Sequence, residues 1–360
     1  MQPKQRILSL LLLLCTTVAS IEMGTVEEFW TDYYDSGGYS MELVYTDYSS
    51  GEAELWTLWS NGPKSLEKNG RFAAGVGEFG VGGSFTNPSL LIFETPGRGG
   101  YDIAGDHNGF LPSILIDGPG EDLQPAVFGK GCVAFSRENT EGGYDIALWS
   151  ADSGVKVLDL GPGDQMWPTF FYAASTEELL PEWADPYTYE SQPGESDPLS
   201  EGVILIYQDN PDGDYRLHYA FIAPGGVVDH YGELTGIEFD GEMLCPDLPN
   251  RYYNKPGYYP DGSTHLAFQG LVDGNRDIYL ADVHMYDGKL VAENLRQLTD
   301  WPGQEKFPDI YAGYGSTWCF FSSDRDGDYD IYALWIEEMR FYQLTDKPGT
   351  QTAPLLMTTL

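Results

Sequence analysis

The sequence has few cysteines and few basic residues. It contains four cysteines, and its 19 Lys and Arg residues stand against 56 Asp and Glu residues, which gives a formal net charge of −37. Cysteines this sparse and widely spaced do not form a disulfide framework. Such an acidic protein repels nucleic acids and anionic lipid surfaces, so we exclude both as partners. We interpret the acidity as a solvated surface in preference to the mark of a specific basic partner.

The motifs of common catalytic sites are also missing. The five histidines occur singly, without a His-Glu-x-x-His pair or a zinc-binding spacing. The sequence contains no Gly-x-Ser-x-Gly nucleophile elbow, P-loop or dinucleotide fingerprint, which excludes a fused peptidase or esterase of the elbow type. Carboxylates are abundant enough to supply an acid–base pair, so cleavage of a glycosidic bond remains an open alternative.

A short apolar run lies near the N-terminus. A Lys and an Arg precede residues 7–14, which are too few to span a bilayer as a helix, and the small residues Val18-Ala19-Ser20 follow. We therefore predict a signal peptide over residues 1–20 and a mature chain that is secreted or periplasmic. No other segment is apolar enough to enter a membrane.

A hairpin motif recurs along the rest of the chain. The hexapeptide Gly-Gly-Tyr-Asp-Ile-Ala occurs at residues 99–104 and again at 142–147. A β-branched or aromatic run precedes most copies, which indicates a β-hairpin with a glycine-containing turn. Aligned on the glycine after the turn, the copies lie at Gly51, Gly99 or Gly100, Gly142 or Gly143, Gly213, Gly274 and Gly327.

A second repeat separates the hairpins. Pro-Gly, four further residues and another Pro occur at residues 119–125, 162–168, 302–308 and 348–354. Proline fixes its own φ and lacks a donor, so the second Pro suits the first residue of a strand and the Pro-Gly suits the preceding turn. Each unit then has four strands, and four-stranded units of about 40 to 50 residues are typical of propeller blades.

The last unit supplies the strand that the first unit lacks. Residues 353–358 open a strand that no hairpin follows, while the first hairpin, near Leu43, has no such strand before it. We therefore predict an all-β fold, a six-bladed β-propeller of four-stranded blades over residues 41–360. The C-terminal strand joins the first blade and closes the ring. Residues 21–40 form an N-terminal segment.

The fifth and sixth units carry the clearest motifs. They are Pro256–Gly262, Leu266–Phe268, Asp277–Tyr279 and Gln297–Thr299 in the fifth unit, and Ser323–Gly327, Asp330–Tyr332 and Gln343–Thr345 in the sixth. These segments resemble the WD-type repeats of the TolB-like β-propeller family, although nothing resembles the N-terminal α/β domain of TolB. The resemblance implies a propeller that serves as a protein-binding platform, a role that varies within the family.

Two segments break the repeat. Residues 173–201 are acidic and proline-rich and interrupt the fourth blade between its first and second strands, and residues 236–255 precede Pro256. Such insertions often carry function, although acidic, proline-rich loops are also often disordered. We expect 236–255 to join the same strand pair as the Pro-Gly loops and to lie on their face, with 173–201 on the opposite face.

We expect the ligand-binding residues on the face of the ring that carries the Pro-Gly loops, here called the Pro-Gly face. The second residue after the glycine accepts hydrogen bonds in all four loops: Asp122, Gln165, Glu305 and Gln351. The alternative is that each satisfies its own turn. Further candidates flank the loops, line the inner strands or come from the second insertion: Trp167, Trp301, Asp309, Tyr311, Asp247, Arg251, Tyr252 and Tyr253. For the aromatic residues, core packing is the alternative.

One turn suggests a cation site. Asp324, Asp326 and Asp328 alternate through a Gly-containing turn and present several oxygens that suit Ca²⁺, although Asp also caps ordinary turns. We predict no other cofactor. The sequence as a whole predicts an exported, monomeric, non-catalytic protein that binds a protein, peptide or glycan in the envelope or outside the cell. A carbohydrate-active hydrolase or lyase that uses channel carboxylates is the alternative.

Overall fold

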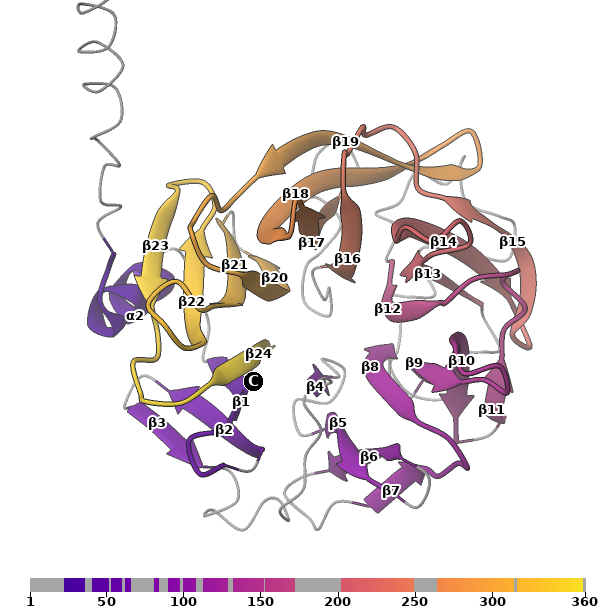
Figure 1. The fold of residues 1–360 in the computed structure, drawn as a ribbon, viewed down its shortest axis with the longest axis horizontal. Helices are drawn as coiled ribbons and strands as arrows, with labels where there is room; N and C mark the ends of the chain where they lie inside the picture. The colour runs from indigo at the N-terminus through magenta and orange to yellow at the C-terminus, as the bar shows by residue number, and fades with distance from the viewer. Residues whose placement is uncertain are drawn as a thin grey trace, which may run out of the picture.

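The computed structural model describes residues 23–35, 41–51, 53–59, 62–65, 81–83, 90–97, 100–107, 113–128, 132–151, 153–171, 202–248, 264–313 and 316–358. These residues form six four-stranded antiparallel sheets arranged around a centre, which the inner strand of each sheet faces (Figure 1). The prediction of an all-β propeller with four-stranded blades is confirmed. The proposed signal peptide and residues 173–201 lie outside the described residues.

The blades follow one another along the chain. Blade 1 contains β24 (Gln351–Thr358), β1 (Met41–Asp47), β2 (Glu54–Trp59) and β3 (Gly62–Ser65). Blade 2 contains β4 (Val81–Gly83), β5 (Leu90–Pro96), β6 (Tyr101–His107) and β7 (Ser113–Ile116). Blade 3 contains β8 (Asp122–Phe128), β9 (Cys132–Glu138), β10 (Tyr144–Ser150) and β11 (Gly154–Val157).

The second half of the ring follows the same plan. Blade 4 contains β12 (Met166–Phe170), β13 (Val203–Asp209), β14 (Arg216–Ala223) and β15 (Val227–Glu233). Blade 5 contains β16 (Glu242–Asp247), β17 (Thr264–Val272), β18 (Asn275–Tyr286) and β19 (Lys289–Gln297). Blade 6 contains β20 (Glu305–Gly313), β21 (Ser316–Ser323), β22 (Asp330–Trp335) and β23 (Arg340–Gln343).

The C-terminal strand occupies the inner position of blade 1. β24 pairs with β1 in antiparallel register, from Met41 opposite Thr358 to Asp47 opposite Gln351. Buried side chains also join the last blade to the first: Trp318 and Phe320 of blade 6 share a cluster with Leu43 and Leu356 of blade 1. Each of the other blade junctions has a cluster of its own among the described residues. That the ring depends on β24 for its stability stays a prediction.

Five inner strands contain the same bulge. The residue before the second Pro of the repeat has a positive φ of 48° to 56°, and the strand pairing shifts at that point. The five residues are Gln124, Trp167, Cys245, Phe307 and Ala353. The strand therefore begins before the second Pro, not at it as the sequence suggested, and the proline follows a bulge, where its missing donor is tolerated.

The bulges also link neighbouring blades. The Gln124 N–H donates to Glu94 Oε1 of blade 2 at 2.7 Å, and the Cys245 N–H donates to Gln208 Oε1 of blade 4 at 2.9 Å. At the junction of the last and first blades, the Ala353 N–H donates to Ser322 Oγ at 3.1 Å. A backbone donor left unpaired by the bulge is thus satisfied by a side chain of the preceding blade.

The segment 236–255 is not one insertion. Residues 242–247 form β16, the inner strand of blade 5, and Pro246 follows the bulge residue Cys245. Asp240-Gly241 takes the place of Pro-Gly, which is why the sequence pattern missed this copy. The expectation that all of 236–255 joins the strand pair of the Pro-Gly loops is therefore wrong: its last residues join β16 to β17, a first strand to a second.

A helix packs over the junction of blades 6 and 1. α2 (Val26–Asp35) lies beside β23 on the outside of the ring (Figure 1). Its N-terminus is a capping box, because the Thr25 N–H donates to Glu28 Oε2 at 2.8 Å and the Glu28 N–H donates to Thr25 Oγ1 at 3.2 Å. Phe29 and Tyr33 are fully buried in the cluster at this junction. Among the described residues, no helix is long and apolar enough to cross a membrane.

Candidate functional site

The Pro-Gly loops are fixed to the hairpin turns of their own blades. The N–H of the residue after the glycine donates to a turn side chain, with Asp164 bonded to Asn210 Oδ1 at 2.7 Å and Gln304 to Asp324 Oδ1 at 2.6 Å. A Cβ at Gly303 would lie 2.7 Å from a backbone nitrogen of the neighbouring turn, so only glycine fits there. The loops therefore present a preorganised face.

The four polar residues predicted on that face are buried, each at most 1 % exposed. Asp122 forms two 2.7 Å hydrogen bonds with the Arg137 guanidinium, and Glu305 Oε1 accepts a 2.7 Å bond from Ser323 Oγ. Gln165 and Gln351 donate to carbonyl oxygens of their own loops, at 3.3 and 2.8 Å. Gln165 and Gln351 thus fasten their own loops, as the alternative holds, whereas Asp122 and Glu305 bind side chains of the neighbouring strand.

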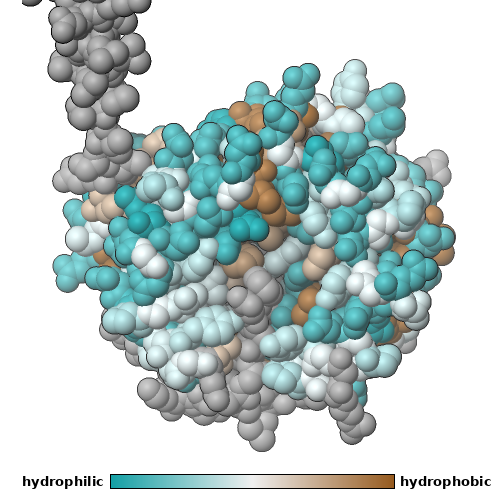
Figure 2. Space-filling view, in the orientation of Figure 1, coloured by the Kyte–Doolittle hydropathy of each residue, from teal (hydrophilic) through white to brown (hydrophobic). Residues whose placement is uncertain are grey.

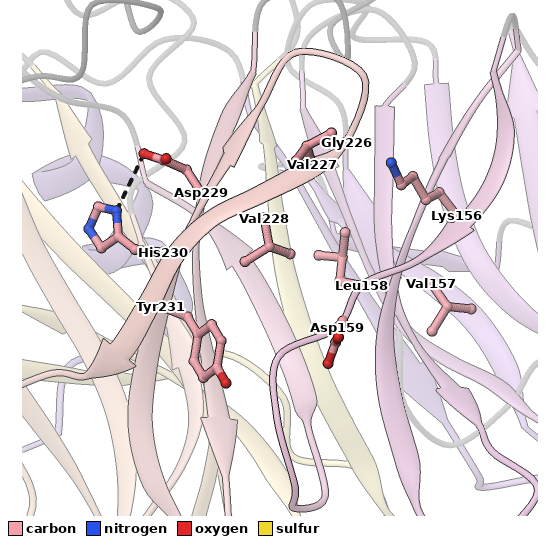
Figure 3. Close-up of a pocket in the computed structure, with 10 residues that line it drawn as sticks. All are labelled: Lys156, Val157, Leu158, Asp159, Gly226, Val227, Val228, Asp229, His230 and Tyr231. Carbon is pink, nitrogen blue, oxygen red and sulfur yellow. Dashed lines mark ion pairs between the residues drawn. The ribbon is translucent and has the colours of Figure 1, made fainter.

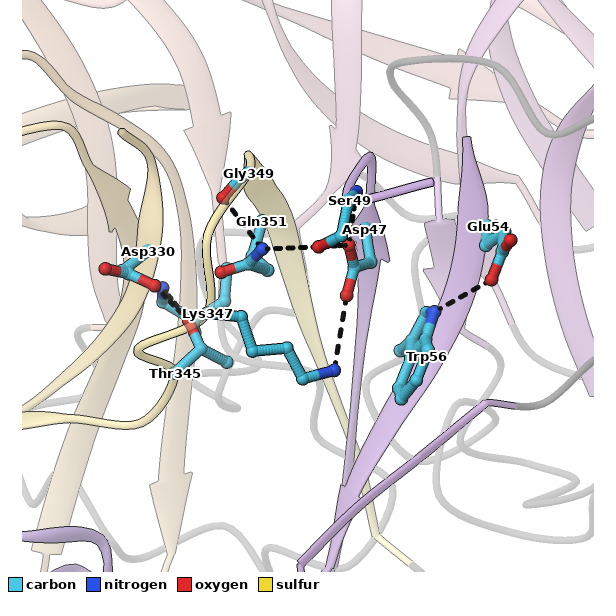
Figure 4. A network of polar contacts seen from close by, with 10 residues as sticks. Asp47, Ser49, Glu54, Trp56, Asp330, Thr345, Lys347, Gly349 and Gln351 are labelled. Carbon is cyan, nitrogen blue, oxygen red and sulfur yellow. Dashed lines mark hydrogen bonds and ion pairs between the residues drawn. The ribbon is translucent and has the colours of Figure 1, made fainter. Parts of the chain in front are cut away.

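Figure 4 shows this arrangement in blade 1, where Gln351, the first residue of β24, faces the end of β1. Its amide nitrogen donates to Gly349 O at 2.8 Å and to Ser49 Oγ at 3.3 Å. Beside it, Lys347 reaches Asp47 Oδ2 at 3.4 Å, and its ammonium lies 3.4 Å from the centre of the Trp56 ring. One of the few basic side chains of the protein thus ties the loop before β24 to β1 and β2.

Two aromatic rings meet at the Pro-Gly ends of the inner strands. Trp167 of blade 4 and Phe307 of blade 6 stack with ring centroids 5.7 Å apart and an interplanar angle of 30°, and both are partly exposed. The Trp167 N–H donates to Gln124 Oε1 at 3.1 Å and to Ser136 Oγ at 3.2 Å. Trp167 was predicted as a ligand residue and Phe307 was not, although both precede the second Pro of their repeats.

Trp301 lies in the packed interior instead, and Tyr311 is partly buried against the cluster that α2 joins. Trp301 is 5 % exposed and packs in the cluster between blades 5 and 6, with the Arg325 guanidinium 4.1 Å above its ring centre. Tyr311 lies in the second half of β20 and faces Tyr33 of α2, with ring centroids 6.3 Å apart. Core packing, the alternative considered for the aromatic residues, therefore describes both.

Asp247 and Asp309 lie at equivalent positions of neighbouring inner strands, directly after the prolines of their bulges. Asp247 Oδ2 accepts the N–H of Ile310 at 2.7 Å, and Asp309 Oδ2 accepts the N–H of Leu356 at 2.6 Å, so each carboxyl links its strand to the next blade. Burial raises the pKa of Asp309 to about 7. Burial, and then the charge of Asp309, raise the pKa of Asp247 well above its usual value.

The aspartates of the suggested cation site have separate partners. Asp324 Oδ1 accepts the Gln304 N–H at 2.6 Å, and Asp328 Oδ2 accepts the N–H of Gly349 at 2.7 Å. Asp326 Oδ2 accepts the Tyr332 hydroxyl at 2.9 Å. In the part of the chain that the structure describes, no three His, Cys, Asp or Glu side chains converge as metal ligands. Asp324 and Asp328 thus accept amides of Pro-Gly loops, and Asp326 accepts a tyrosine hydroxyl.

Three other predicted ligand residues cannot be placed. Arg251, Tyr252 and Tyr253 lie outside the described residues. Of the predicted set, the structure places only Trp167 partly exposed among the Pro-Gly loops, and Asp247 and Asp309 deeper along the inner strands. Figure 2 shows that hydrophilic residues cover most of the described surface on the side viewed.

Comparisons with known proteins agree on the fold. TolB from Acinetobacter baumannii superimposes with a TM-score of 0.59 at 12 % identity, over 89 % of this chain and 67 % of that one. A putative TolB from Agrobacterium tumefaciens superimposes with a TM-score of 0.51 at 12 % identity, over 90 % of this chain and 100 % of that one. The chain thus has a TolB-like propeller fold. A puromycin hydrolase mutant superimposes with a lower TM-score of 0.43 at 14 % identity, over 76 % of this chain and 40 % of that one. No protein-family model and no curated protein matches the chain.

Proposed function

We propose that this is an exported, non-catalytic binding protein that uses the Pro-Gly face of its propeller to bind a protein, peptide or glycan. The stacked pair Trp167 and Phe307 is the observation that carries the proposal, since both rings are partly exposed and both stand at the Pro-Gly ends of inner strands. Export rests on the leader-like sequence of residues 1–20.

The physical argument is preorganisation. Both rings belong to bulge residues with a positive φ, 54° for Trp167 and 53° for Phe307. The backbone N–H of Trp167 also donates to two side chains of blade 3. The neighbouring Pro-Gly loops are tied to their hairpins. An aromatic platform that is already ordered loses little conformational entropy on binding, and large amphipathic rings dominate many interfaces with peptides and sugars.

The test combines discovery of a ligand with two variants. The mature protein is used for pull-downs from envelope and secreted fractions and for a glycan array, and the affinity for each candidate is then measured by calorimetry. Trp167→Ala and Phe307→Ala should each lower the affinity for a genuine ligand at least about tenfold, the range expected for a central aromatic anchor. Tyr286→Ala, which removes a tyrosine that is 67 % exposed on the β18–β19 hairpin, is the control. Undiminished binding by both folded variants refutes the proposal.

A carbohydrate-active hydrolase or lyase is the second candidate, favoured by Asp247 and Asp309. A carboxyl with a pKa near neutrality is suited to act as a general acid, and hydrolysis of a glycosidic bond canonically uses two carboxyl groups. A glycan-cleavage screen tests it with Asp309→Asn and Asp247→Asn. Turnover that either substitution abolishes, in a variant that unfolds like the wild type, would establish the enzyme and overturn the binding-only proposal.

A further inference from the structure

A groove runs between the outer strands of blades 3 and 4. It has a volume of about 550 Å³ and is lined by residues 156–159 on one side and 226–231 on the other. Figure 3 shows Leu158 and Asp159 on the blade 3 side of this groove, with Val228 and Tyr231 opposite them. Nothing in the proposed function uses this groove, because the groove lies on the periphery of the ring.

The groove is unusually apolar for this surface. Four of the seven large hydrophobic residues exposed in the described part of the chain lie on its two strands. They are Val155 at 39 %, Val157 at 46 %, Val227 at 57 % and Tyr231 at 46 %. Scattered exposed hydrophobic residues are ordinary, whereas a cluster on two facing strands marks an interaction surface.

Both strands are sheet edges. β11 and β15 are the outermost strands of their four-stranded sheets, so each turns one row of backbone N–H and C=O groups away from its own sheet. Asp229 forms a bulge in β15, where the pairing shifts between Phe221 and Ile222. An edge strand accepts an extended peptide by β-augmentation, in which main-chain hydrogen bonds give affinity and side-chain pockets give specificity.

Contacts between the blades define the length of the groove. At one end Lys156 Nζ donates to Gly225 O at 2.6 Å, and at the other a Cβ at Gly161 would lie 2.8 Å from the Tyr231 hydroxyl. The stretch of β15 between them, residues 227–231, spans about 15 Å at roughly 3.3 Å per residue. The groove therefore suits about five extended residues.

The charges select the kind of peptide. The ammonium of Lys156 is bonded within the protein, whereas Asp159 is exposed and the Asp229 side chain is 50 % exposed. The formal charge of the chain, −37, adds a field that attracts cations. Asp229 also lies 3.5 Å from His230, another residue that lines the groove, whose ring stacks on Phe221.

We infer that the groove between β11 and β15 is a second binding site, which takes an extended segment with alternating apolar and basic residues from a partner protein. The apolar side chains of the segment lie against the exposed Val157, Val227 and Tyr231. Its basic side chains meet Asp159 and Asp229, and its backbone pairs with the edge of β15. The site is independent of the Pro-Gly face.

The test uses a fluorescein-labelled octapeptide of alternating Lys and Val, with Lys-Ser and Glu-Val versions of the same length. Fluorescence anisotropy should show saturable binding of the Lys-Val peptide, at least tenfold weaker binding of Lys-Ser, and none of Glu-Val. Hydrogen exchange should slow within residues 154–159 and 227–231. Equal binding of Lys-Ser and Lys-Val would mean non-specific attraction to an acidic surface and would overturn the inference.

Variants locate the site. Asp159→Lys and Tyr231→Ser change exposed residues and should each weaken the Lys-Val peptide at least tenfold, while Tyr286→Ser on another hairpin leaves it unchanged. Trp167→Ala should also bind normally, so failure here is distinguishable from failure of the Pro-Gly face. Loss of peptide binding in Trp167→Ala alone would place the peptide on the Pro-Gly face and refute the inference. A dimer in sedimentation that Tyr231→Ser dissociates would show that the groove is an interface between two copies of the protein, which would also refute it.

Discussion

Removal of residues 354–360 should destabilise the whole ring and not only its last strand. The truncation removes most of β24, the inner strand of blade 1, and exposes the edge of β1. It also removes Leu356, which is 1 % exposed and belongs to the cluster that joins blades 6 and 1. Since the same cluster holds Phe29 of α2, the loss reaches three parts of the structure.

Two contributions set the loss of unfolding free energy that the deletion should cause. Truncation of one buried Leu to Ala costs about 2 to 5 kcal/mol of unfolding free energy. Asp309 then loses its 2.6 Å hydrogen bond from the Leu356 N–H, and a buried acceptor left without its donor costs about 1 to 3 kcal/mol more. The deletion should therefore cost at least about 3 kcal/mol, a large share of the roughly 5 to 15 kcal/mol that stabilises a domain. Leu356→Ala alone should cost about 3 kcal/mol.

Urea unfolding followed by tryptophan fluorescence measures the effect, because Trp318 is fully buried in the affected cluster. Met339→Ala, at a side chain 49 % exposed, serves as the matched control and should change the midpoint little. A truncated protein with the midpoint and slope of the wild type would refute the closure of the ring by β24. A loss confined to residues near β1 in hydrogen exchange would show that the blades unfold independently.

Three further predictions concern titration, the helix cap and the blade motifs. Burial raises the pKa of Asp309 to about 7 and that of Glu305 to about 8, so the folded protein holds more protons than the unfolded chain between about pH 4 and 8. Stability should fall as pH rises through this window, by up to about 1.4 kcal/mol per pH unit for each group, and a flat urea midpoint from pH 5 to 8 would contradict this. Thr25→Ala should cost about 1 kcal/mol in thermal unfolding by removing the N-cap of α2, and no change would show that the cap is dispensable. Thr345→Val should lower the free energy of unfolding by about 1 to 3 kcal/mol, because the Thr345 hydroxyl accepts the Ile331 N–H at 2.8 Å and donates to buried Asp330 at 3.0 Å. Unchanged stability would show that these hydrogen bonds do not explain the Asp-Ile-Tyr and Leu-Thr motifs.

The propeller could be predicted because its repeats are physical requirements of the backbone. A Cβ at Gly163 would lie 2.1 Å from Asp209 Oδ1, and one at Gly303 would meet the next turn, so these loops must keep glycine wherever the blade recurs. The Asp-Ile-Tyr and Leu-Thr motifs recur because Asp277 and Asp330 each accept a threonine hydroxyl from the neighbouring strand segment. Conformational needs of this kind leave a trace in residue identity.

The inner strand of blade 5 was not predicted, because its bulge forms without the first proline and the hydrogen-bonding residue that identified the other copies of the repeat. Asp240-Gly241 keeps the glycine and lacks the proline, and Met243 stands where the other copies have a hydrogen-bonding side chain. The bulge itself, with φ 48° at Cys245 before Pro246, is unchanged. An alignment on the second proline of the repeat would have found the copy, and would also have placed Phe307 beside Trp167.

The direction of the side chains near the bulges could not be predicted from the sequence. A bulge reverses the alternation of a strand, so residues before and after it do not follow a simple period of two. Asp309, a predicted ligand residue, accepts the backbone N–H of Leu356 and so links β20 to β24. An Asp309→Ala variant would therefore lower affinity by damaging the junction between blades 6 and 1 even if the ligand never touched residue 309. Trp167→Ala removes exposed ring area and keeps both hydrogen bonds of its backbone N–H, so a loss of affinity in that variant reports on contact with the ligand.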